Sequence, residues 1–204
     1  YANGNAVMLS GSFSRKGVSA FLQAKRSENM SFRSRRSQTM TAAFINNMPA
    51  FAYQHTYALA AMYPYATQAA PGEWAFQGAF AYTFPRKTAL GGKYGTKLRG
   101  NISYIRGIKR EDPVLFAGSE FGTDGGKTKF FGFGDNYYQD YNLQLEKKFS
   151  GSFNLNAMYM YQRYNQYVIE GHGGNVYSHI GVVDAKYKFD KRFTLRGEVQ
   201  YLHT

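Results

Sequence analysis

Several features are scarce in this sequence, and each scarcity excludes a class of structure. Cysteine is absent, so neither disulfide bonds nor cysteine–metal sites are available. No run of about 18 apolar residues occurs, which leaves no candidate for a transmembrane helix. A helical period of hydrophobic residues is not sustained over any useful length. The remaining choice for these 204 residues is one domain built from β-strands.

Strict alternation of apolar and polar residues is the strongest signal that is present. From Phe193 to Tyr201 the odd positions are mostly apolar and the even positions are polar, and residues 153–166 repeat this pattern. A period of two places the two sets on opposite faces of a strand. About ten strands are predicted: residues 5–14, 17–27, 39–45, 51–63, 73–84 and 96–107, and four between 136 and 203 that include 153–166 and 192–203.

These segments are too long for an ordinary soluble sheet. They run to roughly 9–14 residues, about twice the mean of 5–6 residues for strands in soluble proteins. Length and alternation together are typical of transmembrane barrel strands, whose mean hydropathy is low because half of each strand is polar. We therefore predict an all-β fold, an antiparallel transmembrane β-barrel. The alternative is a soluble β-sandwich, for which shorter strands and a more aliphatic inner face are expected.

The connections also fit a barrel. Short turns at Arg15-Lys16, 150–152 and 190–192 fall on one side of a ten-stranded meander, together with the connections at 46–50 and 85–95. Three of the four connections on the other side are long. Outer-membrane barrels carry short periplasmic turns and longer extracellular loops, which predicts the orientation of the chain.

Aromatic residues mark two depths on the apolar face. Three-residue loops are expected to pair Phe149 with Phe153 and Phe189 with Phe193. Tyr161 lies eight residues beyond Phe153, and Tyr201 lies eight residues beyond Phe193. In a tilted barrel, eight residues correspond to a height of roughly 21 Å, compared with an apolar band of about 25 Å. The predicted aromatic girdle at the lipid interfaces consists of Phe149, Phe153, Phe189, Phe193, Tyr161 and Tyr201.

Both ends of the sequence suggest a larger barrel. The first predicted strand starts on the extracellular side, the last strand ends there, and no terminal aromatic residue closes the chain at 202–204. We expect residues 1–204 to be one barrel domain that is an internal part of a longer chain with twelve or more strands.

The charged residues predict two further features. Asp184, Lys186, Arg196 and Glu198 lie on the polar face of the last two strands, where Asp184 is expected diagonal to Arg196 and Lys186 diagonal to Glu198, within reach of long side chains. These charges suit either a solvated lumen or an interior filled by salt bridges. The net charge of +12 could also indicate nucleic acid, but Lys and Arg are spread over strand ends rather than gathered in a stripe. Contacts with lipopolysaccharide phosphates are expected for five basic residues near the extracellular side: Arg26, Arg33, Arg35, Arg36 and Arg106.

Motifs for catalysis or cofactor binding are not found. Residues 90–98 resemble a phosphate-binding loop only superficially, because the required spacing is absent. Ser178 and His179 are adjacent, so they point to opposite faces and cannot pair. The four histidines show no metal-site spacing with carboxylates. We expect no enzyme activity, no cofactor and no metal.

Three segments resemble the large, uncharacterised outer-membrane barrel proteins of Bacteroidota: QHTYALAAMYPYATQ (54–68), LGGKYGTKL (90–98) and IGVVDAKYK (180–188). The resemblance implies an outer-membrane location and a longer parent sequence, and it implies no catalytic residues. Two functions follow as hypotheses. One is a structural or scaffolding subunit that holds other outer-membrane proteins or lipoproteins; the alternative is a porin-like diffusion channel, suggested by the polar inner face.

Overall fold

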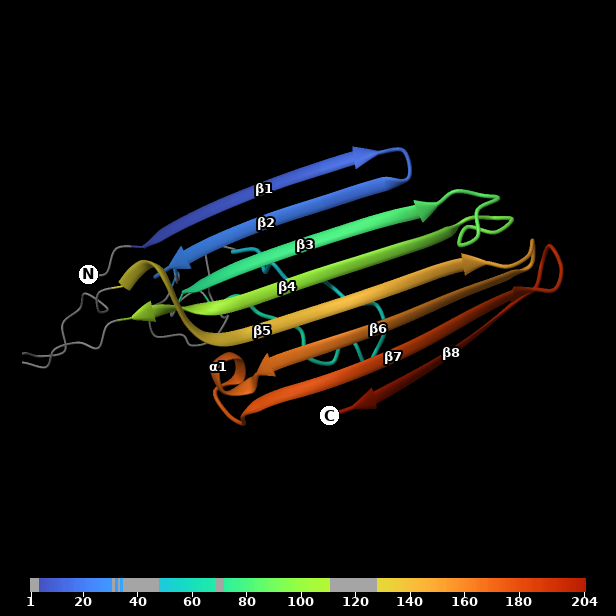
Figure 1. Cartoon of the computed structure of the whole chain (residues 1–204). Coiled ribbons are helices and arrows are strands. Elements are labelled where there is room, and N and C mark those ends of the chain that lie inside the picture. The colour runs from blue at the N-terminus through green and yellow to red at the C-terminus, as the bar shows by residue number, and fades with distance from the viewer. Residues whose placement is uncertain (1–3, 31, 33, 35–47, 69–71, 111–127) are drawn as a thin grey trace, which may run out of the picture.

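The computed structural model describes residues 4–30, 32, 34, 48–68, 72–110 and 128–204. Eight strands in these residues form one antiparallel sheet whose spatial order is the order of the chain (Figure 1). The strands are β1 (Asn5–Arg15), β2 (Val18–Glu28), β3 (Glu73–Phe84), β4 (Thr96–Arg110), β5 (Thr128–Lys148), β6 (Phe153–Asn165), β7 (Asn175–Lys188) and β8 (Thr194–His203), and one short helix, α1 (Gln166–Glu170), lies between β6 and β7.

The all-β antiparallel fold is confirmed, whereas the ten-strand count is not. The sheet is open in the described part of the chain, because β1 and β8 lie at its two edges and do not pair with each other. Of the two expected strands that are missing, residues 39–45 lie outside the described residues. None of the helices described here is long and apolar enough to cross a membrane.

The prediction of a strand at residues 51–63 is wrong. Residues 48–68, which we call the inner segment, run as irregular backbone against one face of the sheet (Figure 1). Pro49 and Pro64 flank the expected strand, and proline has no N–H to donate to a ladder. The alternation also stops at Ala58–Met62, where the amide N–H of Ala61 donates to the carbonyl oxygen of Tyr57 at 2.9 Å to form a single turn.

The register of all seven pairings places apolar residues beside apolar residues. Leu98 faces Leu145, Leu145 faces Ala157, and Val183 faces Val199. A slip of one residue in any pair would move a whole strand's apolar set to the other face. The sheet therefore has an apolar face, which carries Leu9, Leu22, Phe80, Ile102, Leu143, Tyr159, Val183 and Val199, and a polar face, which carries the alternate residues.

The turns divide the sheet into two ends. The amide N–H of Phe149 donates to the carbonyl oxygen of Phe153 at 3.0 Å, and that of Phe189 donates to Phe193 at 3.1 Å, so both predicted three-residue hairpins are present. These turns and the β1–β2 and β3–β4 connections lie at what we call the short-turn end (right in Figure 1). The other end is the long-loop end. Residues 48–50 were expected at the short-turn end. They instead lie beside the half of β2 that is nearer the long-loop end, where Pro49 accepts a hydrogen bond from Lys25.

The β1–β2 turn lies one residue further along than predicted. Arg15 pairs with Val18, so the loop consists of Lys16 and Gly17, and Gly17 has a φ of +82°. Left-handed backbone costs other residues about 1–2 kcal/mol.

We expect Gly17→Ala to lower the free energy of unfolding by about that amount, measured by urea titration of the purified protein. Gly151→Ala is the matched control, because this turn glycine does not have a left-handed backbone; equal losses in both variants would contradict the explanation.

Candidate functional site

The inner segment builds the buried core of the molecule on the polar face of the sheet. At the long-loop end, Phe51 and Tyr65 pack against Ile105, Tyr138 and Tyr164. Nearer the middle, Tyr57 and Ala60 pack in the same way against Met158, Met160, Ile180 and Val182. A single sheet needs a second layer to bury one of its faces, and in the described residues the inner segment is that layer.

Side chains from several strands satisfy the backbone of the inner segment. The Oγ of Ser103 on β4 accepts a hydrogen bond from the amide of Tyr53 at 3.2 Å. The Oε1 of Gln200 on β8 accepts from the amide of Leu59 at 2.9 Å. Gln162 on β6 donates to the carbonyl oxygen of Tyr63 at 3.0 Å. These bonds replace the strand ladder that the segment lacks, because buried backbone groups need partners.

A buried ion pair fixes both ends of the inner segment to the sheet. The Nζ of Lys25 on β2 lies 2.6 Å from the Oε1 of Glu73 on β3, and neither side chain is exposed. Lys25 also donates to the carbonyl oxygen of Pro49 at 2.6 Å. Glu73 in turn accepts from the amide of Gln68 at 2.9 Å and from the hydroxyl of Tyr65. One pair therefore contacts the beginning and the end of the segment.

A buried histidine–aspartate pair fixes the middle of the inner segment to the sheet. The Nε2 of His55 lies 2.5 Å from the Oδ2 of Asp140 on β5, and the other carboxylate oxygen accepts from the Nδ2 of Asn142 at 2.8 Å. Sequence reasoning missed this pair, because His55 was assigned to a strand and the partners are 85 residues apart. No third metal-ligating residue joins them among the residues described, which hold no cluster of three or more His, Cys, Asp or Glu.

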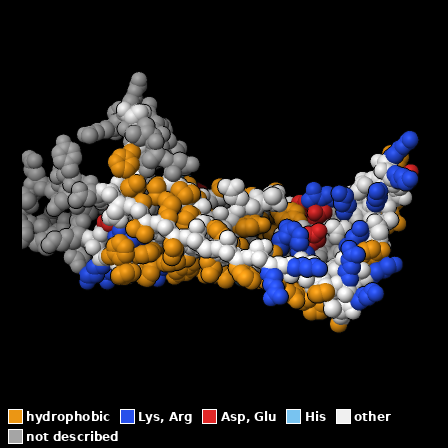
Figure 2. Space-filling view, turned by 90° about the horizontal axis from the view of Figure 1, so that it is seen from above, with side chains coloured by type: hydrophobic (Ala, Val, Ile, Leu, Met, Phe, Trp, Pro, Cys, Tyr) orange, Lys and Arg blue, Asp and Glu red, His pale blue; other side chains and the backbone are white. Residues whose placement is uncertain are grey.

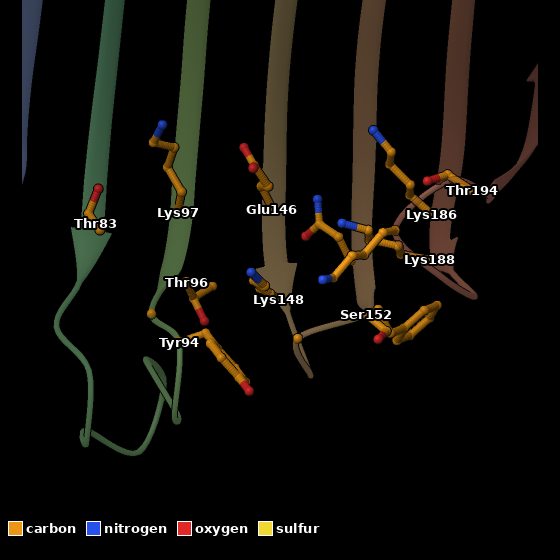
Figure 3. A pocket seen from close by; sticks show the side chains of 15 residues that line it. Thr83, Tyr94, Thr96, Lys97, Glu146, Lys148, Ser152, Lys186, Lys188 and Thr194 are labelled. Atoms are coloured by element: carbon orange, nitrogen blue, oxygen red, sulfur yellow. The ribbon is translucent and has the colours of Figure 1, made fainter.

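The short-turn end of the polar face is charged and lies beyond the inner segment. Lys and Arg side chains gather there, while hydrophobic side chains line one side of the sheet (Figure 2). A pocket of about 540 Å³ opens between the strand ends of β3 to β8. Its charged residues, most of them seen in Figure 3, are Lys97, Glu146, Lys148, Lys186, Lys188 and Lys191. We call this site the lysine pocket.

The four charges expected to face a lumen all lie on the polar face at this end. Arg196 donates to both carboxylate oxygens of Asp184, at 2.9 Å each, and to Glu198 at 2.9 Å. The expected diagonal pair of Asp184 and Arg196 is present. The expected pair of Lys186 and Glu198 is not formed: Glu198 is held by Arg196 and Gln200, and Lys186 instead lines the lysine pocket.

The predicted aromatic girdle residues all lie on the apolar face of the sheet. Phe149, Phe189 and Phe193 are exposed at the short-turn end. Phe153 lies beside Phe149 with the ring centroids 5.6 Å apart. Tyr161 and Tyr201 lie towards the opposite end of β6 and β8, as the count of eight residues requires.

The five arginines expected to contact lipopolysaccharide are not a uniform group. Arg33, Arg35 and Arg36 lie outside the described residues. Arg26 is 2% exposed, lies 2.8 Å from Glu28 and donates to Asn5, so its guanidinium is buried in an ion pair, and its contact with a lipid phosphate stays a prediction. Arg106 lies near the long-loop end, as expected, and donates two hydrogen bonds to the carbonyl oxygen of Gly134, at 3.0 and 2.7 Å.

Comparison with known families gives one finding. A family of unknown function (DUF6029) matches residues 1–204. No curated protein and no solved structure matches the chain.

Removing one member of the buried ion pair should release the inner segment. Breaking a buried pair costs about 3–5 kcal/mol, because the other charge remains buried without a partner. We expect Lys25→Met to lower the free energy of unfolding by about that amount and to make residues 48–68 susceptible to limited proteolysis. Lys16→Met, in the exposed turn of the same hairpin, is the control and should change neither.

The double variant Lys25→Met/Glu73→Gln separates the charge effect from a packing effect. The amide introduced at position 73 would be neutral and could still accept hydrogen bonds from Tyr65 and Gln68. Because no buried charge is then left without a partner, this variant should be more stable than Lys25→Met alone. A double variant that is less stable than either single variant would contradict the role of the ion pair.

Proposed function

We propose that this chain, which belongs to the family of unknown function DUF6029, forms part of the wall of a transmembrane β-barrel in a bacterial outer membrane and serves as a structural subunit of a larger outer-membrane assembly. The observation that carries the proposal is the apolar face, which exposes hydrophobic side chains on all eight strands, although Phe130 of β5 contacts Arg26 and Trp74 over its long-loop end. Leu9, Leu22 and Val199 are 74%, 69% and 71% exposed. Soluble monomers rarely expose an apolar patch of more than a few hundred Å², whereas lipid is a suitable solvent for such a face.

The positions of the charges support a lipid-facing wall. On the apolar face of the described strands, the charged residues lie near the strand ends, among them Arg26, Glu28, Arg106 and Arg163 towards the long-loop end, and Arg15 and Lys147 at the short-turn end. The middle of the face carries none. A Lys or Arg costs about 2–4 kcal/mol at the midplane of a bilayer and little near its interfaces, so this distribution is the one that a membrane requires.

The inner segment favours a structural role over an open pore. It covers the long-loop half of the polar face and buries Lys25, Asn101, Ser103 and Asp140 beneath it. In a closed barrel this face would line the lumen, and several outer-membrane barrels are filled by such inward-folded elements. Other outer-membrane proteins or lipoproteins are the proposed partners, with the short turns on the periplasmic side and the longer loops, near lipopolysaccharide, on the extracellular side.

A diffusion channel is the second candidate, and the lysine pocket is the observation that favours it. The pocket remains open at the short-turn end, and its positive charge would select for anions. Planar-bilayer recordings of the intact protein, together with co-purification from native membranes, distinguish the two functions. Silent bilayers with co-purifying partners are expected for the scaffold. Large, stable, anion-selective conductance steps would overturn the scaffold in favour of the channel.

The lipid-facing assignment predicts that the two faces respond differently to charge. Leu143 lies at the middle of the apolar face, and we expect Leu143→Lys to lower the stability of the protein in lipid bilayers by about 2–4 kcal/mol. The control is Gln144→Lys, at the same depth on the polar face, which should cost no more than about 1 kcal/mol for the lost hydrogen bond to Asn156. Urea unfolding in vesicles measures both; equal costs would contradict a lipid-facing wall.

A further inference from the structure

The lysine pocket contains far more positive than negative charge, because arginines already neutralise the nearby acids. Glu146, the one carboxylate that lines it, lies 3.4 Å from Arg99. Asp184 and Glu198 are both held by Arg196, at 2.9 Å each. The carboxylate of Asp190 accepts from the amide of Lys191 within the β7–β8 turn. No ion pair within the described residues involves the lysines that line the pocket: Lys97, Lys148, Lys186, Lys188 and Lys191.

The strand register brings the backbone positions of these lysines close together. Lys148 faces Asn154, and Asn154 faces Lys186, so the two lysines are separated by two strand spacings, or roughly 10 Å. Lys186 and Lys188 project from the same face of β7, roughly 7 Å apart along the strand. Such distances are comparable with the screening length at physiological salt, about 8 Å. The lysines therefore repel one another unless an anion lies between them.

We propose that the lysine pocket binds a soluble polyanion that carries two or more phosphate groups. Lysine ammonium groups bind phosphate as point charges, and one multivalent anion can contact several of them at once. The pocket volume of about 540 Å³ lies within the usual range for small-molecule sites, about 300–1,000 Å³. Lys148 stands over the ring of Tyr94, 5.3 Å from its centroid, which restrains this ammonium group at the entrance.

The geometry points to a dissolved ligand rather than a lipid headgroup. The pocket lies on the polar face, whereas most of the exposed hydrophobic side chains of the strands lie on the opposite face of the sheet. A phosphate anchored in a bilayer against the apolar face would have to cross the sheet to reach Lys186. The inference goes beyond the proposed function, because a scaffold and a channel could each carry this site, and its test does not depend on which of them is correct.

Binding of tripolyphosphate to the intact protein, measured by isothermal titration calorimetry, tests the proposal. We expect Lys148→Gln/Lys186→Gln to weaken binding by about tenfold or more. The control, Lys16→Gln/Lys147→Gln, removes the same charge from the same end of the sheet but not from the pocket, since Lys147 points to the apolar face beside Phe149. Circular dichroism verifies that each variant is folded.

Three results would overturn the proposal. The first is equal binding by the pocket variant and the wild type. The second is an equal loss of binding affinity in the control variant, which would mean that tripolyphosphate is attracted to the basic surface in general. The third is displacement of tripolyphosphate by vesicles that contain lipopolysaccharide, which would identify a lipid phosphate as the ligand. A loss in the pocket variant alone, with no effect of the vesicles, supports a soluble polyanion.

Discussion

A single sheet cannot bury its own side chains, and the rest of this structure depends on that constraint. Eight strands in regular register create two faces, and each face needs something to cover it. On the polar face the inner segment supplies the cover, and the ion pair of Lys25 and Glu73 fixes it there. On the apolar face the described part of the chain supplies a cover at the long-loop end alone, where Phe130 contacts Arg26 and Trp74. The asymmetry between a covered polar face and a largely uncovered apolar face is the reverse of a soluble sandwich, in which the apolar face would be the core.

The charges follow the same division. On the polar face beneath the inner segment the charges are buried and matched: Lys25 with Glu73, and His55 with Asp140. Towards the short-turn end they are accessible, and only the arginines are matched with acids. A buried charge without a partner is strongly unfavourable, whereas an accessible lysine can remain in water until a ligand arrives. Burial thus explains why the two ends of one face carry such different chemistry.

The sequence was sufficient to predict what depends on local periodicity. Alternation predicted the strands that were formed, and the paired Phe residues predicted both three-residue hairpins. It could not predict the inner segment, because residues 51–57 alternate like a strand, and the partners of the whole segment are side chains up to 141 residues away. The lysine pocket was missed for a related reason. Only Lys186 was singled out, since Lys97 and Lys148 join it through the three pairings from β4 to β7, and a period of two along one strand does not show them.

The two edges of the sheet make the strongest physical case for a closed barrel. β1 and β8 are 11 and 10 residues long, and each presents a row of backbone groups that has no strand partner in the described residues. In water such edges invite aggregation, and in a bilayer each unsatisfied group costs several kcal/mol. If the apolar face contacts lipid, as proposed, these edges must be paired, either with each other or with further strands. Under that proposal, closure into a barrel would satisfy the edges while it leaves the apolar face directed outward.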